Sequence, residues 1–259
     1  MDLGLTGRRA IVCASSRGLG RACATSLARE GAAVVINGRD AARLGATREA
    51  IRAATGATVI TVAADVSTDA GRRALLAACP EPDVLVTNNG GPPPMAFADA
   101  TAADWQAALE ANMLSAIFLI QAVLPGMRRR RFGRIVNITS AMVKSPHPLM
   151  GLSTAARSGL TALVKAVSKE VAADNVTLNN LLPERFDTDR QRRMAELVMA
   201  VRHVSFEEAR AEQVAQIAAG RLGRPEELGD ACAFLCSAQA GFISGQNLSL
   251  DGGSYAGLI

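Results

Sequence analysis

The sequence has few of the side chains from which most metal sites and many acid–base sites are built. Its 259 residues include 2 histidines and 1 tyrosine, and aromatic residues make up only 3% of the chain. With 2 histidines a multi-histidine metal site is not expected, and we predict no metal. The 5 cysteines are odd in number and contain no Cys-x-x-Cys pair. This pattern argues against a disulfide scaffold and favours reduced thiols in a cytoplasm.

Long apolar runs and a strong charge of one sign are also missing. The best apolar run, residues 116–124, contains Gln121 and is far shorter than the roughly 18 residues of a membrane span. The first residues do not show a basic segment followed by an apolar one, so we expect no secretory signal. The net charge of +4 is too small to indicate nucleic acid, and the basic run 128–131 lacks interleaved aromatics.

Short apolar runs alternate with longer segments of helical period along the whole chain. Strands are predicted at residues 9–14, 33–37, 58–63, 83–87, 134–139, 176–182 and 247–250. Helices are predicted at 18–30, at 40–54, after a cap at Ser67 or Thr68, at 104–131, 150–173, 187–219 with a break near His203, and 225–237. The alternation predicts an α/β fold: a doubly wound, mostly parallel seven-stranded sheet with helices on both faces. No linker or repeat divides residues 1–259, so we expect a single domain with its ligand at the carboxyl ends of the strands.

A turn of small residues joins the first predicted strand to the first helix. It spans residues 14–20, Ala-Ser-Ser-Arg-Gly-Leu-Gly, and would let a pyrophosphate approach the helix N-terminus. A plain tight turn is the alternative. The second strand ends in Asn37-Gly38-Arg39 instead of the acidic residue that favours NAD. Because the guanidinium of Arg39, with Arg17 in reach, suits a 2′-phosphate, NADP is favoured over NAD. A solvated Arg39 is the alternative.

Several short motifs then follow in a fixed order. Residues 13–20 are similar to Thr-Gly-x-x-x-Gly-x-Gly, and residues 88–91 are similar to Asn-Asn-Ala-Gly. Asp65 lies between these two segments, and Asn112 follows the second. The tail adds segments 223–227, 243–246 and 251–253. Over nearly its whole length the chain resembles the short-chain dehydrogenase/reductase family. The Gly-Gly-Pro-Pro-Pro loop at 90–94 further resembles a divergent subgroup similar to 3-oxoacyl-acyl-carrier-protein reductases.

This resemblance implies a Rossmann-type homotetramer that reduces a ketone or 3-oxoacyl group with NADP(H). The substrate would be a small carbonyl or alcohol compound, free or linked to an acyl-carrier protein, which is also the alternative partner for the basic run 128–131. Together with Arg17 and Arg39, the expected cofactor-binding residues are Ala14, Ser16, Gly18, Leu19, Gly20, Asp65, Val66, Asn89, Gly90, Gly91, Arg157, Pro183 and Thr188.

The family's catalytic pattern of Asn, Ser, Tyr and Lys is broken in this chain. The resemblance assigns the first two to Asn112 and Ser140, with Ser140 binding the carbonyl oxygen. The tyrosine and lysine positions hold Ser153 and Arg157, and the only tyrosine is Tyr255. A serine hydroxyl is a far weaker acid than a phenol with a pKa near 10, and losing positioned acid–base catalysis costs roughly 10²–10⁴-fold in rate. Arginine stays protonated and cannot relay protons, although it can hydrogen-bond the ribose.

Other side chains are candidates for the missing proton donor. Lys144 and His147 follow Ser140 in the loop that borders the substrate in this family, and Glu184 replaces the glycine of the family's Pro-Gly pair. A solvated loop side chain is the alternative for each. Replacing the turn's first glycine by Ala14 costs roughly 1–2 kcal/mol if that position needs a positive φ.

The segment after Pro183 is expected to form a substrate loop and lid over residues 184–220. Its arginines, Arg190, Arg192 and Arg193, either border an acidic substrate or belong to ordinary surface. Three functions stay open at this stage. The chain is a reductase with a substituted proton donor, a catalytically silent NADP-binding sensor or partner subunit, or an interaction protein that binds no cofactor.

Overall fold

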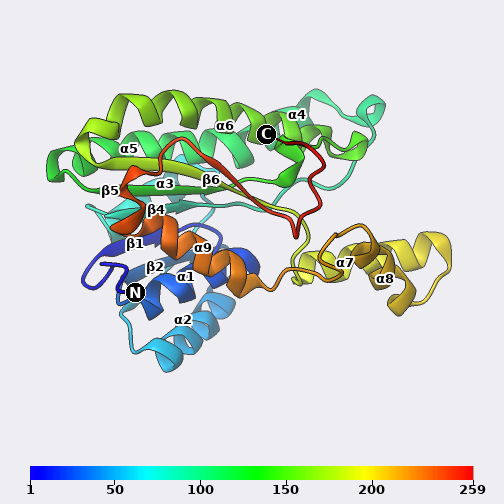
Figure 1. Ribbon diagram of the computed structural model, residues 1–259, viewed down its shortest axis with the longest axis horizontal. Coiled ribbons are helices and arrows are strands. Elements are labelled where there is room, and N and C mark those ends of the chain that lie inside the picture. The colour runs from blue at the N-terminus through cyan, green and yellow to red at the C-terminus, as the bar shows by residue number, and fades with distance from the viewer. Residues whose placement is uncertain (259) are drawn as a thin grey trace.

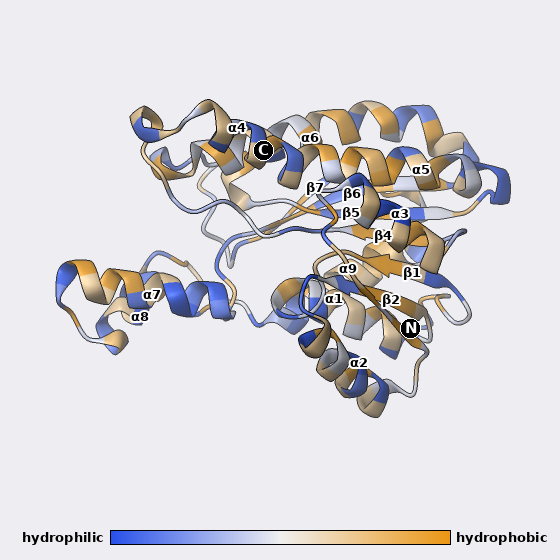
Figure 2. Ribbon diagram, turned by 180° about the vertical axis from the view of Figure 1, so that it is seen from behind, coloured by the Kyte–Doolittle hydropathy of each residue, from blue (hydrophilic) through white to orange (hydrophobic). Residues whose placement is uncertain are grey.

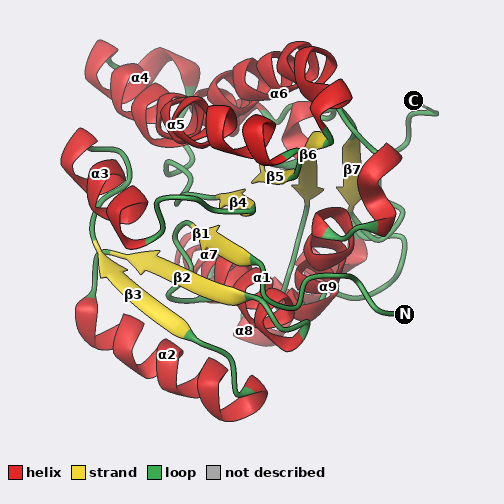
Figure 3. Ribbon diagram, turned by 90° about the vertical axis from the view of Figure 1, so that its left-hand side faces the viewer, coloured by secondary structure: helices red, strands yellow, loops and turns green. Residues whose placement is uncertain are grey.

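The computed structural model describes residues 1–258 and is built around one sheet of seven parallel strands in the order β3-β2-β1-β4-β5-β6-β7 (Figures 1 and 3). The strands are β1 (Arg9–Val12), β2 (Ala33–Gly38), β3 (Val59–Ala63), β4 (Val84–Thr87), β5 (Gly133–Ile138), β6 (Val176–Pro183) and β7 (Asn247–Leu250). The doubly wound sheet expected from the sequence is therefore confirmed, and every predicted strand is found.

Helices cover both faces of the sheet because side chains of its central strands alternate between two apolar cores. In β1, Ala10 and Val12 belong to one core, while Ile11 and the following Cys13 belong to the other. Figure 2 shows the apolar strands enclosed between the two helical layers. One layer consists of α1 (Gly18–Arg29), α2 (Ala41–Thr55) and α9 (Pro225–Cys236), and the other of α3 (Asp69–Ala78), α4 (Ala102–Leu109), α5 (Ser115–Arg130) and α6 (Gly151–Val171).

The helix predicted over residues 104–131 is interrupted, which corrects the sequence-based expectation of one continuous helix. It starts at Ala102, after Thr101 forms a capping box with Asp104, and a π-helical turn at Glu110–Leu114 separates α4 from α5. Such turns widen the helix and are frequent at functional sites.

The same segment, Ala102–Arg130, has the length and hydropathy of a membrane-crossing helix. In the fold it is a core helix of the sheet. Leu119, Val123 and Met127 of α5 are buried in the core that lies between the sheet and the α3–α6 layer.

Two helices project from the body beyond the carboxyl end of β6 (Figures 1 and 2). They are α7 (Asp189–Arg202) and α8 (Phe206–Ala215), and they pack on each other. The predicted break near His203 is confirmed, since this residue ends α7 with a φ of +55°.

A chain of side-chain hydrogen bonds runs across four neighbouring strands. Thr87 Oγ1 of β4 donates to Asn137 Oδ1 of β5 at 2.6 Å, and Asn137 Nδ2 donates to Asn180 Oδ1 of β6 at 3.2 Å. Asn180 Nδ2 then donates to Asn247 Oδ1 of β7 at 2.8 Å. These bonds satisfy amides in the sheet interior and join β4 to β7 next to the strand ends that carry the site.

Candidate functional site

A cavity of about 420 Å³ opens at the carboxyl ends of β1, β4, β5 and β6. Its walls come from the turn before α1, the loop after β4, the end of β5, the start of α6 and the segment from the end of β6 into α7. The sequence placed the ligand at this edge of the sheet. Of the predicted site residues, the cavity brings together Ala14, Arg17, Gly18, Leu19, Asn89, Gly90, Gly91, Ser140, Ser153, Arg157, Pro183 and Thr188.

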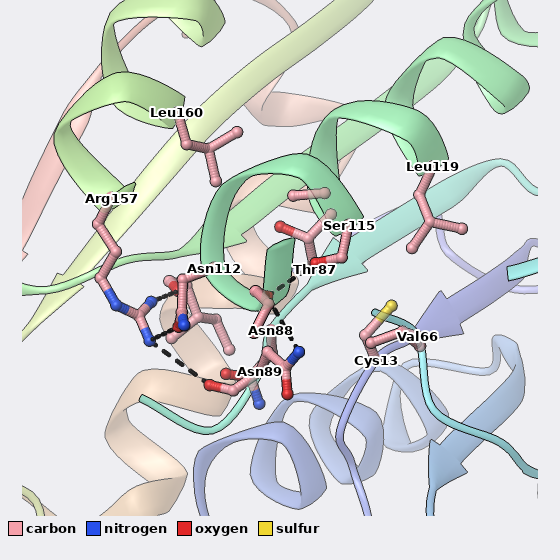
Figure 4. A pocket seen from close by; sticks show the side chains of 13 residues that line it. Cys13, Val66, Thr87, Asn88, Asn89, Asn112, Ser115, Leu119, Arg157 and Leu160 are labelled. Carbon is pink, nitrogen blue, oxygen red and sulfur yellow. Dashed lines mark hydrogen bonds between the residues drawn. The ribbon is translucent and has the colours of Figure 1, made fainter. Parts of the chain in front are cut away.

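The wall of this cavity does not include the other predicted site residues, which are Ser16, Gly20, Arg39, Asp65, Val66 and Asn112. Val66 and Asn112 line a narrow crevice of about 10 Å³ that also contains Asn89 and Arg157 (Figure 4). Among residues 1–258, no group of three or more His, Cys, Asp or Glu side chains is placed to hold a metal ion.

The turn before α1 has the geometry of an anion site. No side chain caps the N-terminus of α1, so its first N–H groups are available to a ligand. Gly18 has a φ of +55°, and a Cβ there would meet its nearest heavy atom only at 3.8 Å. Gly20 plays a different part, since a Cβ on it would lie 2.4 Å from the Ala14 carbonyl oxygen. The first glycine leaves room for a ligand, and the second lets the helix approach the turn.

The end of β2 presents Arg39 to solvent. Its side chain is 83% exposed, and Nη1 lies 3.8 Å from Asp65 Oδ2. Hydrogen bonding from Ser67 is the main reason why the pKa of Asp65 is lowered, and the charge of Arg39 contributes less. Arg17 is paired elsewhere, 3.5 Å from Asp189 of α7. The structure thus pairs the two predicted phosphate-binding arginines with different carboxylates.

Arg157 is buried in α6 and uses its whole guanidinium to bind the protein (Figure 4). Each of its five N–H groups has a neutral oxygen acceptor. The acceptors are Ser153 Oγ at 3.2 Å, the carbonyls of Ile138 at 2.8 Å, Thr139 at 3.1 Å and Asn89 at 3.5 Å, and Asn112 Oδ1 at 2.9 Å. Burial lowers the pKa of Arg157 to about 10, so the side chain still carries its charge at neutral pH.

This network determines where the predicted catalytic side chains lie. Asn112 sits in the π-helical turn, where its amide oxygen faces Arg157. Ser153 lies one helical turn before Arg157 and accepts its Nε–H. Ser140 lines the cavity, and its Oγ accepts the N–H of Met142 at 3.2 Å. A hydrogen bond from Arg157 to a ribose would have to replace one of its protein contacts.

The sequence pattern of the family described as enoyl-(acyl carrier protein) reductase matches residues 13–255. The chain belongs to the short-chain dehydrogenase/reductase family. Over 253 residues it is 32% identical to the 3-oxoacyl-[acyl-carrier-protein] reductase FabG of Vibrio cholerae, covering 98% of this chain and 99% of that one.

Solved structures of this family are similar over the full chain. The L-sorbose reductase of Gluconobacter frateurii, complexed with NADPH and L-sorbose, has a TM-score of 0.95 at 28% identity and covers 100% of both chains. A 3-oxoacyl (acyl-carrier-protein) reductase of Agrobacterium tumefaciens C58 with NADP bound has a TM-score of 0.87 at 33% identity and covers 97% and 96%. An NAD(P)-binding Rossmann fold in an oxidoreductase family is therefore established for this chain.

Within this short-chain dehydrogenase/reductase, the structure separates the three candidate proton donors. Lys144 Nζ lies 5.1 Å from the ring centre of Tyr255. His147 is exposed, and its Nδ1 accepts the N–H of Leu149 at 3.3 Å. Of the three, only Glu184 lines the cavity. Tyr255 is not among the side chains of the cavity wall, so the chain's only tyrosine does not take the missing position.

The environment of Glu184 favours its neutral form. Burial is the largest cause of its raised pKa. The charge of Arg185 opposes the shift, Asp251 adds to it, and a hydrogen bond from Ser254 opposes it. A carboxyl group with a raised pKa in the wall of a substrate-sized cavity is a candidate proton donor there.

Ala14, the first residue of the turn, has a φ of +45°. The condition stated above for backbone strain at this position is therefore met. We expect Ala14→Gly to raise the free energy of unfolding by about 1 kcal/mol, since glycine adopts this conformation without the Cβ penalty. Urea denaturation of both proteins measures the difference. The matched control is Ala50→Gly on the exposed side of α2, which should lower stability by about 0.5–1 kcal/mol. Equal losses in both variants would contradict the assignment of strain to Ala14.

Sequence reasoning missed two features of this short-chain dehydrogenase/reductase site. The cavity wall also contains Met142, Met150 and Gln191, none of which stood out in any motif. The π-helical turn at Asn112 was missed as well. The one available signal for this turn was Asn112, which matches the family asparagine. That match gave the position of the residue along the chain but not the conformation of its backbone.

Proposed function

We propose that the protein is an NADP(H)-dependent reductase of a ketone or 3-oxoacyl substrate that works without the family's tyrosine and lysine. The observation that carries this proposal is the cavity at the switch point of the sheet, which joins the uncapped N-terminus of α1 to Ser140 and Glu184. The relatives named for 3-oxoacyl reduction and the neighbours complexed with NADPH or NADP support it.

The residues present fit the dinucleotide. The N–H groups at Gly18 and Leu19 would hold its pyrophosphate, with Thr188 next to Gly18 in the same cavity. Arg39 would hold a 2′-phosphate, for which its exposed guanidinium is free to leave Asp65. When bound, NADPH supplies the hydride for the carbonyl carbon.

The side chains of this chain would then handle the carbonyl oxygen. Ser140 orients it by donating a hydrogen bond, while the buried charge of Arg157 favours the negative charge that develops on it. Glu184 gives its proton to that oxygen as the C–O double bond becomes a single bond. The carboxylate that remains takes a proton from water before the next turnover. This sequence balances one hydride and one proton per carbonyl reduced.

Titration with NADPH and with NADH tests the cofactor part of the proposal. A ligand that binds only the folded state adds about 2.7 kcal/mol of stability at 100 times its Kd and so raises the melting temperature. Because Arg39 would hold the 2′-phosphate, this rise should be larger with NADPH than with the same concentration of NADH. Arg39→Ser should remove the advantage of NADPH and leave the NADH shift unchanged. Arg48→Ser, which removes an exposed arginine paired with Glu49, is the control. No shift with either dinucleotide would overturn the proposal and leave a Rossmann fold that serves as an interaction scaffold.

A second candidate function is a catalytically silent NADP-binding member that acts as a sensor or partner subunit. The observation that favours it is the occupation of all five Arg157 donors by protein oxygens, because this stabilises the site without leaving a ribose contact. Clear NADPH binding without turnover of any carbonyl compound would support this function over the reductase.

Two further properties belong to the proposal. The reductase acts in the cytoplasm as a homotetramer, built partly on α4–α5 and α6. The outer faces of these helices support that assembly, since Phe118 is 41% and Leu163 is 36% exposed there. Residues 184–220, including α7 and α8, serve as its substrate lid.

A further inference from the structure

The charges in the cavity wall do not balance. Two carboxylates line it, and one of them, Asp189, is paired with Arg17. The wall contains four arginines, namely Arg17, Arg157, Arg190 and Arg193. After the Arg17–Asp189 pair is set aside, the wall contains three guanidinium groups and one carboxyl group, that of Glu184.

These three arginines differ from most arginines of the chain, which are paired with a carboxylate. Arg157, Arg190 and Arg193 form no ion pair within residues 1–258. Arg192, which lies between two of them in sequence, is turned away from the cavity and reaches Asp187 at 3.7 Å. Arg190, Arg192 and Arg193 are all exposed, but Arg192 is paired with a carboxylate, whereas the other two line the cavity without one.

Arg190 extends from α7 across to the loop after β4. Its Nη1 and Nη2 donate to the carbonyl oxygens of Gly91 at 3.3 Å and Pro92 at 3.4 Å. Both bonds are longer than the usual range for an N–H···O bond, so these donors are weakly held. Burial is the largest cause of the lowered pKa of Arg157 and of Arg190, and the charge of Arg190 adds to the first shift and that of Arg193 to the second. This mutual repulsion would be relieved by an anion bound among them.

We propose that the substrate carries an anionic group, a carboxylate or a phosphate, which Arg190 and Arg193 bind from the lid. This inference rests on the proposed function and narrows its substrate class. A guanidinium matches the oxygens of both groups with two parallel hydrogen bonds. The pyrophosphate of the dinucleotide is the other anion of this cavity, but the uncapped N-terminus of α1 already provides its site.

The test compares charged carbonyl compounds with neutral counterparts of the same skeleton. The pairs are acetoacetate and ethyl acetoacetate, levulinate and ethyl levulinate, and dihydroxyacetone phosphate and dihydroxyacetone. For each we would measure kcat/KM with NADPH, and by calorimetry the Kd for the protein saturated with NADP⁺. At least one charged compound should be favoured roughly 10- to 100-fold, the range of a charge-assisted hydrogen bond.

Variants connect that preference to the named residues. Arg190→Met and Arg193→Met should each reduce the ratio of kcat/KM for the charged compound to kcat/KM for its neutral counterpart roughly tenfold or more. Arg192→Met is the matched control, since it removes a neighbouring arginine that does not line the cavity. In Arg192→Met the ratio of kcat/KM for the charged compound to kcat/KM for the neutral one should equal that of the unsubstituted protein.

The outcomes separate this inference from the proposed function. Equal use of charged and neutral compounds would overturn the anionic substrate and leave the reductase standing. A weaker affinity for NADPH in Arg190→Met, with the preference unchanged, would also overturn it and assign the charge to the cofactor. Arginine-dependent binding of a charged compound without turnover would support the anion site while the reductase activity fails.

Discussion

Replacing Glu184 by glutamine is expected to slow carbonyl reduction roughly 10²–10⁴-fold while NADPH affinity stays unchanged. Glutamine keeps the shape and the hydrogen bonding of the side chain but has no acidic proton. Of the three candidate donors, Glu184 is the one in the cavity wall, so its loss removes the proton source closest to the bound carbonyl. Single-turnover oxidation of NADPH with a ketone measures the chemical step directly.

The pH dependence supplies an independent readout. The active form is the neutral acid, and burial raises the pKa of Glu184 while Arg185 opposes and Asp251 assists. The rate should be highest at low pH and fall as the pH rises through the raised pKa, and Glu184→Gln should lack this decline. The free energy of unfolding should change in the same direction as the rate. A carboxyl group whose pKa is raised in the folded protein contributes stability at low pH and loses this contribution as the pH rises through the folded pKa. Glu226→Gln on exposed surface is the control. A rate and pH profile unchanged in Glu184→Gln would place the donor elsewhere.

Restoring the family pair by Ser153→Tyr with Arg157→Lys is expected to raise reduction of 3-oxoacyl compounds roughly 10²–10⁴-fold. A phenol is a far better acid than the serine hydroxyl, and a lysine one helical turn away lowers its pKa. Both positions line the cavity, so the introduced hydroxyl would face the substrate. Steady-state kinetics with a 3-oxoacyl thioester measures the gain.

Folding has to be checked in this double variant. Lysine has three donors where arginine has five, so some of the five oxygens around Arg157 lose their partner. Each buried acceptor left unsatisfied costs about 1–3 kcal/mol. Ser153→Tyr alone retains the arginine network and is the second variant to assay. A melting curve and an NADPH titration would show that both proteins are folded before their rates are compared.

Combining the two changes tests them against each other. With the tyrosine in place, Glu184→Gln should cost far less than in the unsubstituted protein, because a second donor serves the same oxygen. A full loss in the triple variant would mean that the tyrosine does not protonate the substrate. Activity in the double variant, together with none in the unsubstituted protein, would favour the silent NADP-binding member.

The sequence predicted most of the fold because its evidence for structure is local. The strand β1 and the break at His203 each follow from a few adjacent residues. The motifs likewise located the turn before α1 and Ser140, since the family resemblance fixes positions along the chain. Local patterns cannot tell which side of a helix will meet a distant loop.

The parts that escaped prediction depend on contacts between distant segments. The five acceptors of Arg157 come from α6, the last residue of β5 and the residue after it, the loop after β4 and the π-helical turn, up to 68 residues away. Arg190, Arg192 and Arg193 looked alike in sequence, yet only the fold pairs Arg192 with Asp187 and leaves its neighbours in the cavity wall. The choice of Glu184 over Lys144 likewise required knowing which loop faces inward.

The side-chain hydrogen bonds from Thr87 to Asn247 also limit how this fold can change. A slip of one residue between β5 and β6 would turn Asn180 to the opposite side of the sheet and separate it from both partners. The strands that present Asn88, Ser140 and Glu184 are thereby locked in register. New substrate preferences in this scaffold would therefore arise through changes in α7 and α8, which take no part in these hydrogen bonds. The strands β4 to β7 beneath the cavity would keep their register.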